Sequence, residues 1–338
     1  MRTTERDAAG GLRLTVLNPG GRDPEQDFGP GVPAPDEGAH PPVNFHAYAA
    51  CIRGVFQRDL PRAIDAGRPV LLLLRGDFKK TQRALAELKK HGLTVAVSLK
   101  ETGLHQIARQ LGDPKRAKRF RAIVEAADGS LAATPEALSF YGGGRFIPTP
   151  YPIADPRWDF SRSLGERSGI FVGTREWAVP SRHHLAALLL ALGLGEPVTV
   201  FDEDAKRCRK ILAALGVPHD SLRILQKRLP YHDYLAEMAR HKIVLQADKS
   251  GVPGQVAGDA LLCRLPCVGG DGAIERLAFP ATCGHGRSLG ELRELAARLF
   301  REPSLYEAIV AQSQALARER LSFQAGARQL AEFFQQLV

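Results

Sequence analysis

Residues 245–275, LQADKSGVPGQVAGDALLCRLPCVGGDGAIE, carry the clearest fold signal in the sequence. It begins at the end of a short apolar run, 242–245, which predicts a strand, and a loop of small residues, 248–254, follows. Residues 255–263 have the length and apolar spacing of a helix, and 265–268 predicts a second buried strand. Loop N–H groups and a helix N-terminus in this order can hold an anion such as a diphosphate. An ordinary βαβ unit, whose glycines only make turns, is the alternative.

Length and composition predict a two-domain globular protein. The chain has 338 residues, which suits two domains of about 150 to 180 residues. Hydrophobic residues make up 44% and charged residues 25%, as in soluble proteins, and no apolar run approaches the roughly 20 residues of a membrane span. The N-terminus lacks the apolar core of a secretion signal. The five cysteines have no zinc-site or disulfide spacing, so we expect a reduced, cytoplasmic protein.

The positive charge is concentrated in one segment. Between Arg75 and Arg121 stand 13 lysines and arginines against four acids, while the whole chain has a net charge of +9. Such a patch fits an anionic membrane surface on the cytoplasmic side, a phosphate-bearing acceptor or nucleic acid. Only Phe78 and Phe120 are aromatic there, so a base-stacking platform, and with it a nucleic-acid partner, is not expected. A solvated pair of helix faces without a partner is the alternative.

Strands and helices alternate twice along the chain. The first series has apolar strands at 12–17, 70–74, 93–99, 129–133 and 146–148, and Asn44 is placed to cap a helix running through Phe56. The second series has strands at 169–173, 197–201, 222–225 and 242–245. Alternation of this kind predicts parallel sheets with helices on both faces.

Four prolines, at 148, 150, 152 and 156, separate the two series. We therefore expect an N-terminal Rossmann-like domain at 12–150, a proline-rich hinge at 151–168 and a C-terminal Rossmann-like domain at 169–338. In this arrangement the last helix can pack back on the N-terminal domain. The expected fold class is α/β, with two doubly wound domains facing each other across a cleft and the ligand at their strand ends.

Four segments together point to a family. They are 126–136 (AADGSLAATPE), 172–175 (VGTR), 259–268 (DALLCRLPCV) and 272–275 (GAIE). In this order they resemble the GT-B glycosyltransferases, most of all family 4, whose donor domain carries Glu-Ala-Met-Ala-x-Gly-x-Pro-Val-Val and then Gly-Gly-Ile-Pro-Glu. The resemblance covers most of residues 120–338.

The resemblance implies a transferase. It would move a sugar from a nucleotide-diphosphate donor to a glycan, lipid-linked or small-molecule acceptor for a cell envelope, polysaccharide or secondary metabolite. It would act with retention and without a metal or other cofactor. The family's ribose-binding Glu falls on Asp259, and its sugar-contacting Glu falls on Gly251, so Asp248 would have to substitute. This loss keeps a non-catalytic nucleotide-sugar-binding or scaffold protein as the alternative.

The resemblance and the strand ends together assign the site residues. Arg175 and Lys227 are the cations expected to stabilise the leaving diphosphate. In the acceptor domain, His46 is expected to orient or deprotonate an acceptor hydroxyl, with a structural role as the alternative. Glu275 either touches the ligand or is an acid favoured at a helix N-terminus. The remaining donor-binding residues are expected to be Gly173, Thr174, Ser250, Gly251, Pro253, Gly254 and Gln255.

Overall fold

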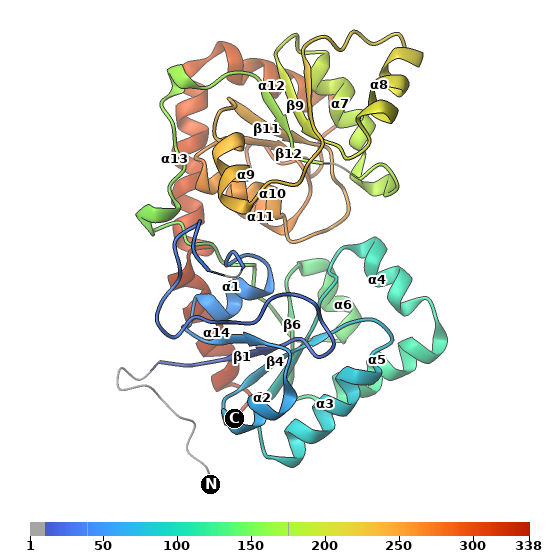
Figure 1. The fold of residues 1–338 in the computed structure, drawn as a ribbon, viewed down its shortest axis with the longest axis vertical. Coiled ribbons are helices and arrows are strands. Elements are labelled where there is room, and N and C mark those ends of the chain that lie inside the picture. Colours follow the sequence, from blue (N-terminus) through green and yellow to red (C-terminus); the bar gives the residue numbers. More distant parts are fainter. Residues whose placement is uncertain (1–10, 39, 175) are drawn as a thin grey trace. The chain divides into compact units, whose positions relative to one another are not determined.

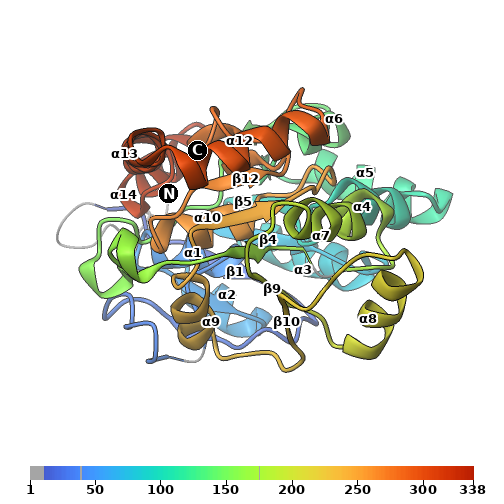
Figure 2. The same cartoon turned by 90° about the horizontal axis from the view of Figure 1, so that it is seen from above.

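The computed structural model describes residues 11–38, 40–174 and 176–338 (Figures 1 and 2). The chain divides into two compact units, each an α/β unit with a largely parallel sheet, which confirms the predicted fold class. Unit 1 takes the described residues up to Ala154 together with Arg320–Val338, and unit 2 is Asp155–Glu319. Most of the segment expected as a hinge, from residue 155 on, is thus part of unit 2. Residues 320–338 belong to unit 1.

Unit 1 is built on a seven-stranded sheet in the order β2-β3-β1-β4-β5-β6-β7. Every pair is parallel except β2 with β3. The central strands are buried, as their apolar runs predict. The strands are β1 Thr15–Leu17, β2 Gln26–Asp27, β3 Val55–Gln57, β4 Val70–Leu74, β5 Val95–Leu99, β6 Gly129–Ala132 and β7 Arg145–Phe146.

Helices cover both faces of this sheet. The apolar sides of α3, α4, α5 and α6 share one core with β4 and β5, and α1 and α14 share the other. Helix α14, at the C-terminal end of the chain, thus packs beside α1 (Figure 1). The helices are α1 Phe45–Ala50, α2 Leu60–Asp65, α3 Lys79–Lys90, α4 Leu104–Leu111, α5 Pro114–Ala126, α6 Leu138–Tyr141 and α14 Phe323–Gln335.

The prediction of one helix from Asn44 through Phe56 is wrong. Helix α1 ends at Ala50, and Phe56 lies in β3, buried and paired with β1. Arg53 has a positive φ of 51°, which breaks the helix. A Cβ at Gly54 would lie 2.2 Å from the carbonyl oxygen of Leu14, so this turn passes too close to β1 for a larger residue.

Unit 2 has five parallel strands in the order β10-β9-β8-β11-β12. They are β8 Ile170–Val172, β9 Val198–Phe201, β10 Leu222–Leu225, β11 Ile243–Gln246 and β12 Cys267–Gly269. The direction of strand order reverses between β8 and β11, and ligands of open α/β sheets bind beyond the carboxyl ends of the strands at such a point. Residues 245–275 form the predicted succession of strand, loop, helix and strand.

Seven helices surround this sheet in the part of the chain that the structure describes. Apolar residues of α7 and α12 form the core on one face, and α9 and α10 contact each other. None of the described helices is long and apolar enough to cross a bilayer. The helices are α7 His184–Leu192, α8 Ala205–Ala214, α9 Tyr231–Met238, α10 Gln255–Leu262, α11 Ala273–Ala278, α12 Leu289–Arg301 and α13 Pro303–Arg320.

Candidate functional site

The loop after β11 leads directly into helix α10 at the reversal point of the sheet. Gly254 precedes the helix with a φ of +93°, which favours glycine. Within the described residues, the backbone N–H groups of Val256 and Ala257 have no hydrogen-bond partner. Because a helix N-terminus concentrates unpaired donors and partial positive charge, the first turn of α10 is built to receive an anion.

A buried ion pair fixes this loop to the segment that follows β8. Asp248 is 3% exposed, and its carboxylate accepts hydrogen bonds from Arg182 and, at 2.7 Å, from the backbone N–H of Ser250. Arg182 lies 2.9 Å from a carboxylate oxygen of Glu176 as well. The hydroxyl oxygens of Ser250 and Ser181 are 2.8 Å apart. These contacts hold a cation at the loop before α10. We call Arg182, residues 248–254 and the first turn of α10 the anion cradle.

The side chain of Glu275 packs against the loop before α10. One carboxylate oxygen accepts a 2.7 Å hydrogen bond from Gln246, and the other has no partner among the described residues. A Cβ added at Gly254 or Gly272 would come 2.0 or 2.4 Å from that second oxygen. Burial raises the pKa of Glu275 to about 7, and the nearby charge of Asp248 acts in the same direction.

Helix α11 offers no open N-terminus to a ligand. The backbone N–H groups of Ala273 and Ile274 donate to the carbonyl oxygens of Val252 and Pro253, each at 3.0 Å. The predicted residue Pro253 therefore closes α11, and Glu275 is 1% exposed behind it. Contact between Glu275 and a ligand stays a prediction.

Asp259 is turned toward helix α9. Its carboxylate accepts a hydrogen bond from the Tyr231 hydroxyl, and it is 1% exposed. Burial raises its pKa to about 7, although hydrogen bonds from Tyr231 and Tyr234 act against that rise. Its described contacts are with α9 rather than with the anion cradle, and its role toward a donor ribose stays a prediction.

The end of β8 lies against the cradle. A Cβ at Gly173 would come 2.4 Å from a methyl carbon of Val256 in α10, so glycine allows the strand end and the helix to meet. Thr174 is buried, and its hydroxyl lies 3.0 Å from Nδ1 of His184. Burial lowers the pKa of His184. The prediction for Arg175 lies outside the described residues.

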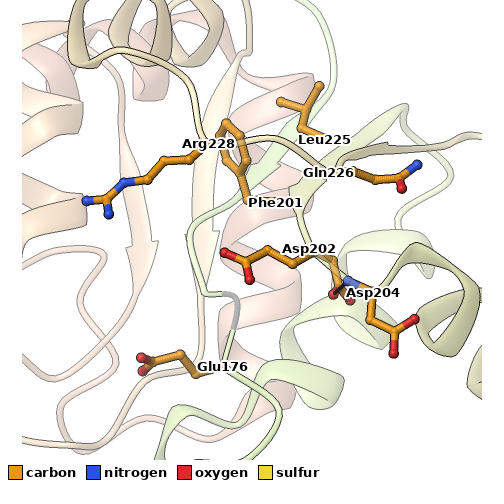
Figure 3. A pocket seen from close by; sticks show the side chains of 8 residues that line it. Glu176, Phe201, Asp202, Asp204, Leu225, Gln226 and Arg228 are labelled. Atoms are coloured by element: carbon orange, nitrogen blue, oxygen red, sulfur yellow. Dashed lines mark hydrogen bonds between the residues drawn. The ribbon is translucent and has the colours of Figure 1, made fainter.

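A pocket of about 340 Å³ opens at the ends of β9 and β10 (Figure 3). Among its described lining residues, four side chains are carboxylic acids and Arg228 is the cation. Asp202 accepts a 2.6 Å hydrogen bond from the indole N–H of Trp177. Such a lining repels phosphate but accepts N–H and O–H donors. The lining residues are Glu176, Phe201, Asp202, Glu203, Asp204, Leu225, Gln226 and Arg228.

Two predicted residues are not part of the cradle. Lys227 is exposed after β10, and β9 separates β10 from β8 in the sheet. His46 belongs to unit 1 and is 1% exposed, with its ring stacked 3.6 Å from that of Phe56 and its Nε2 2.9 Å from the carbonyl oxygen of Pro24. Burial lowers the pKa of His46 to about 3. These contacts are those of a structural histidine, and its role as a base stays a prediction.

The structure thus gathers Gly173, Asp248, Ser250, Gly254 and Glu275 around the start of α10. Gly251 lies in the same loop with a φ of +58°, and Gln255 is the exposed first residue of the helix. Sequence reasoning missed Arg182, Ser181 and Trp177. All three follow β8, in the first strand-to-helix connection of a Rossmann unit, and that position was the available signal. Among the described residues, no cluster of His, Cys, Asp and Glu is arranged to hold a metal ion.

Comparison with known proteins supports the fold. No family model and no curated protein matches the chain. Among solved structures, Anabaena HepE in complex with UDP superposes with a TM-score of 0.62 at 14% identity, covering 96% of this chain and 100% of that one. A trehalose-6-phosphate structure from E. coli bound with UDP-2-fluoro glucose gives 0.62 at 10% identity, covering 96% and 99%.

A third similar structure is the alpha,alpha-trehalose 6-phosphate synthase of Burkholderia multivorans. It superposes with a TM-score of 0.60 at 9% identity, and the match covers 97% of each chain. Identities this low establish the fold alone. The chain has the GT-B fold of two Rossmann-like units, as its motifs predicted, while membership of family 4 stays a prediction.

Proposed function

We propose that the protein is a glycosyltransferase that takes a sugar from a nucleotide-diphosphate donor. The observation that carries the proposal is the anion cradle, where Arg182 and the N–H groups of Val256 and Ala257, which have no partner among the described residues, meet at one loop. The loop follows the strand at which the sheet order reverses, which is where α/β units bind nucleotides. Similar structures that contain UDP or a UDP-sugar share this fold across almost the whole chain.

The adjacent pocket suits the uncharged half of such a donor. Its acids disfavour phosphate, but they accept hydrogen bonds from ribose hydroxyls and from N–H groups of a base. Its volume of about 340 Å³ lies in the range of small-molecule sites. We therefore place the nucleoside at the ends of β9 and β10 and the diphosphate at the start of α10.

Transfer needs stabilisation of the negative charge that grows on the leaving diphosphate. Arg182 supplies a fixed positive charge, because buried Asp248 holds its guanidinium. Glu176 is its exposed partner, and a phosphate would replace that carboxylate without disturbing Asp248. The N–H groups of Val256 and Ala257 add charge-assisted hydrogen bonds. No metal is required by this arrangement, and the retaining course follows from the resemblance to family 4.

The acceptor side is proposed from unit 1. Exposed cations of α3 and α5, two helices in contact, have no ion-pair partner among the described residues, and they suit an anionic or membrane-bound acceptor. A glycan, lipid-linked or small-molecule acceptor, handled at the cytoplasmic face of a membrane, fits this surface. The cations are Lys80, Arg83, Lys115, Arg116 and Lys118.

Calorimetric titration with UDP, GDP, ADP and CDP tests the donor site. We expect one nucleotide to bind saturably, and Arg182→Gln to weaken it by about tenfold or more, as expected for a lost charge-assisted hydrogen bond. This variant leaves the buried carboxylate of Asp248 without its cationic partner, which should lower stability. The double variant Arg182→Gln/Asp248→Asn removes that buried charge, so it should restore thermal stability but not nucleotide affinity. Arg209→Ala, which removes an exposed arginine of α8, is the control. No binding by any nucleotide, or binding indifferent to Arg182, contradicts the proposal.

A non-catalytic nucleotide-sugar-binding protein is the second candidate. The loop position at which family 4 has its sugar-contacting Glu is Gly251, and its φ of +58° is one that glycine favours. The carboxylate of Asp248, the expected substitute, already accepts hydrogen bonds from Arg182 and from the backbone N–H of Ser250. Incubation of the matching nucleotide-sugars with a panel of acceptors separates the two candidates. Nucleotide release that depends on an acceptor supports the transferase, and binding without any release supports the second candidate.

A further inference from the structure

A second pocket lies in unit 2 at the opposite end of helix α10 from the anion cradle. It has a volume of about 490 Å³, and most of the residues that line it belong to the segment before β8 and to helix α13. Four arginines line it, against one acid, Glu307. We call it the arginine pocket; its arginines are Arg162, Arg167, Arg264 and Arg318.

Arg167 is a buried cation that has no carboxylate partner in the described part of the chain. It is 7% exposed, and its guanidinium donates to the carbonyl oxygens of Cys263 and Arg264 and to the Tyr306 hydroxyl. Its Nε has no hydrogen-bond partner among the described residues. The carbonyls at the C-terminal end of α10 carry only about half a negative charge, so about half of the charge of Arg167 is uncompensated. A buried charge in this state is costly unless a counter-ion lies near.

The neighbouring arginines increase the positive potential. Arg162 and Arg318 are exposed, and neither has an ion pair among the described contacts. Arg264 is paired with Asp159 at 2.6 Å. Glu166 is close to Arg162 and Arg167, but its carboxylate accepts hydrogen bonds from the backbone N–H and the hydroxyl of Ser163. Several cations around one concave surface focus a field that concentrates anions.

The apolar part of the lining indicates that the bound anion also has an apolar group. Leu164, Val310 and Ala311 lie in the same pocket as the arginines, and Tyr306 is buried at its side. An inorganic phosphate alone would fill a small part of the volume. Guanidinium forks favour phosphate oxygens, which they bind in bidentate geometry. We infer that the arginine pocket binds a small organic phosphate, at a site separate from the proposed donor site.

Phenyl phosphate is the probe, titrated calorimetrically into the full chain carrying Arg182→Gln, which weakens the anion cradle. We expect saturable binding that is tighter than that of inorganic phosphate, because of the apolar lining. Arg162→Ala/Arg318→Ala should weaken it by about tenfold or more, since two charge-assisted contacts are lost. The matched control is Lys206→Ala/Arg209→Ala, which removes two exposed cations of α8.

Ala311→Trp tests the site without changing charge. Ala311 is exposed on α13, and a large ring there should fill the pocket and prevent binding while the fold is kept. When Arg162→Ala/Arg318→Ala or Ala311→Trp is made in the wild-type chain, the affinity for the nucleotide that binds the donor site should stay unchanged, so failure of the nucleotide proposal and failure of this one are distinguishable. Phenyl phosphate binding that is absent, that survives both sets of changes, or that falls equally in the control overturns the inference.

Discussion

Replacing Gly254 with alanine should destabilise unit 2 by more than the cost of placing an alanine in a left-handed backbone conformation. At Gly254 the φ is +93°, and a Cβ would lie 2.0 Å from the carboxylate of Glu275. Gly195 is the matched control, because its φ is +76° and a Cβ there would meet nothing within 4 Å. An alanine in this backbone conformation costs about 1–2 kcal/mol at either position. Overpacking adds about 1–3 kcal/mol at Gly254 alone.

We therefore expect Gly254→Ala to lose about 2–5 kcal/mol of unfolding free energy and Gly195→Ala about 1–2 kcal/mol. Thermal unfolding measures the difference, at about 2–4 °C per kcal/mol for a unit of this size. Gly254→Ala should also weaken nucleotide binding, because the displaced residue begins α10. The control substitution should leave binding unchanged.

A double-mutant cycle with Glu275→Ala identifies the clashing group. In the Glu275→Ala background, Gly254→Ala should cost only what the control substitution costs, giving a coupling energy of about 1–3 kcal/mol. The reasoning fails if the two glycine variants unfold alike in the wild-type background. It also fails if the effects of Gly254→Ala and Glu275→Ala simply add.

Three further predictions concern the buried acids and the acidic pocket. The pKa of Glu275 is raised to about 7 by burial, so the folded state keeps a proton that the unfolded state releases. Wild-type stability should fall by about 3 kcal/mol between pH 4.5 and 7 from this group, and Glu275→Gln should lack that fall in urea unfolding. Tyr231→Phe removes a donor to Asp259, whose pKa is about 7, and should destabilise by about 1–3 kcal/mol at pH 8 but less at pH 5 in thermal melts. Gln226→Trp should fill the pocket at β9 and β10, weakening the binding of the proposed donor nucleotide but not that of pyrophosphate in calorimetry.

Long apolar runs made most of the fold predictable. Residues 70–74 and 222–225 are strands with the predicted bounds, and 245–275 forms the predicted unit. Strand β3 was missed because its three residues, Val55–Gln57, are too few to show alternation. Its identity as a strand depends on pairing with β1, and the carbonyl oxygen of Leu14, the residue before β1, lies close to Gly54. Such a long-range contact leaves no local pattern.

The site was predicted less completely, for a physical reason. Glycines in the loop before α10 indicate backbone geometry locally, so Gly254 was found from the sequence. The partner of Asp248 was not, because Arg182 lies 66 positions earlier and meets it only when β8 and β11 pair. Whether a cation is exposed or held by a buried acid is a tertiary property. Lys227 and Arg182 look alike in the sequence and differ in this respect.

Asp259 shows why a motif position does not by itself assign a role. A carboxylate in family 4 at this place implies contact with ribose hydroxyls, but here the Tyr231 hydroxyl already occupies it and burial raises its pKa to about 7. To meet a ribose, the carboxylate would have to exchange one hydroxyl donor for another inside a buried site. Glu203, which is exposed and lines the open pocket at the ends of β9 and β10, can accept a ribose hydroxyl without that exchange. Glu203 therefore suits the proposed nucleoside site on geometric grounds that Asp259 lacks, whereas Asp202 is buried and already accepts hydrogen bonds from Trp177 and the backbone N–H of Asp204.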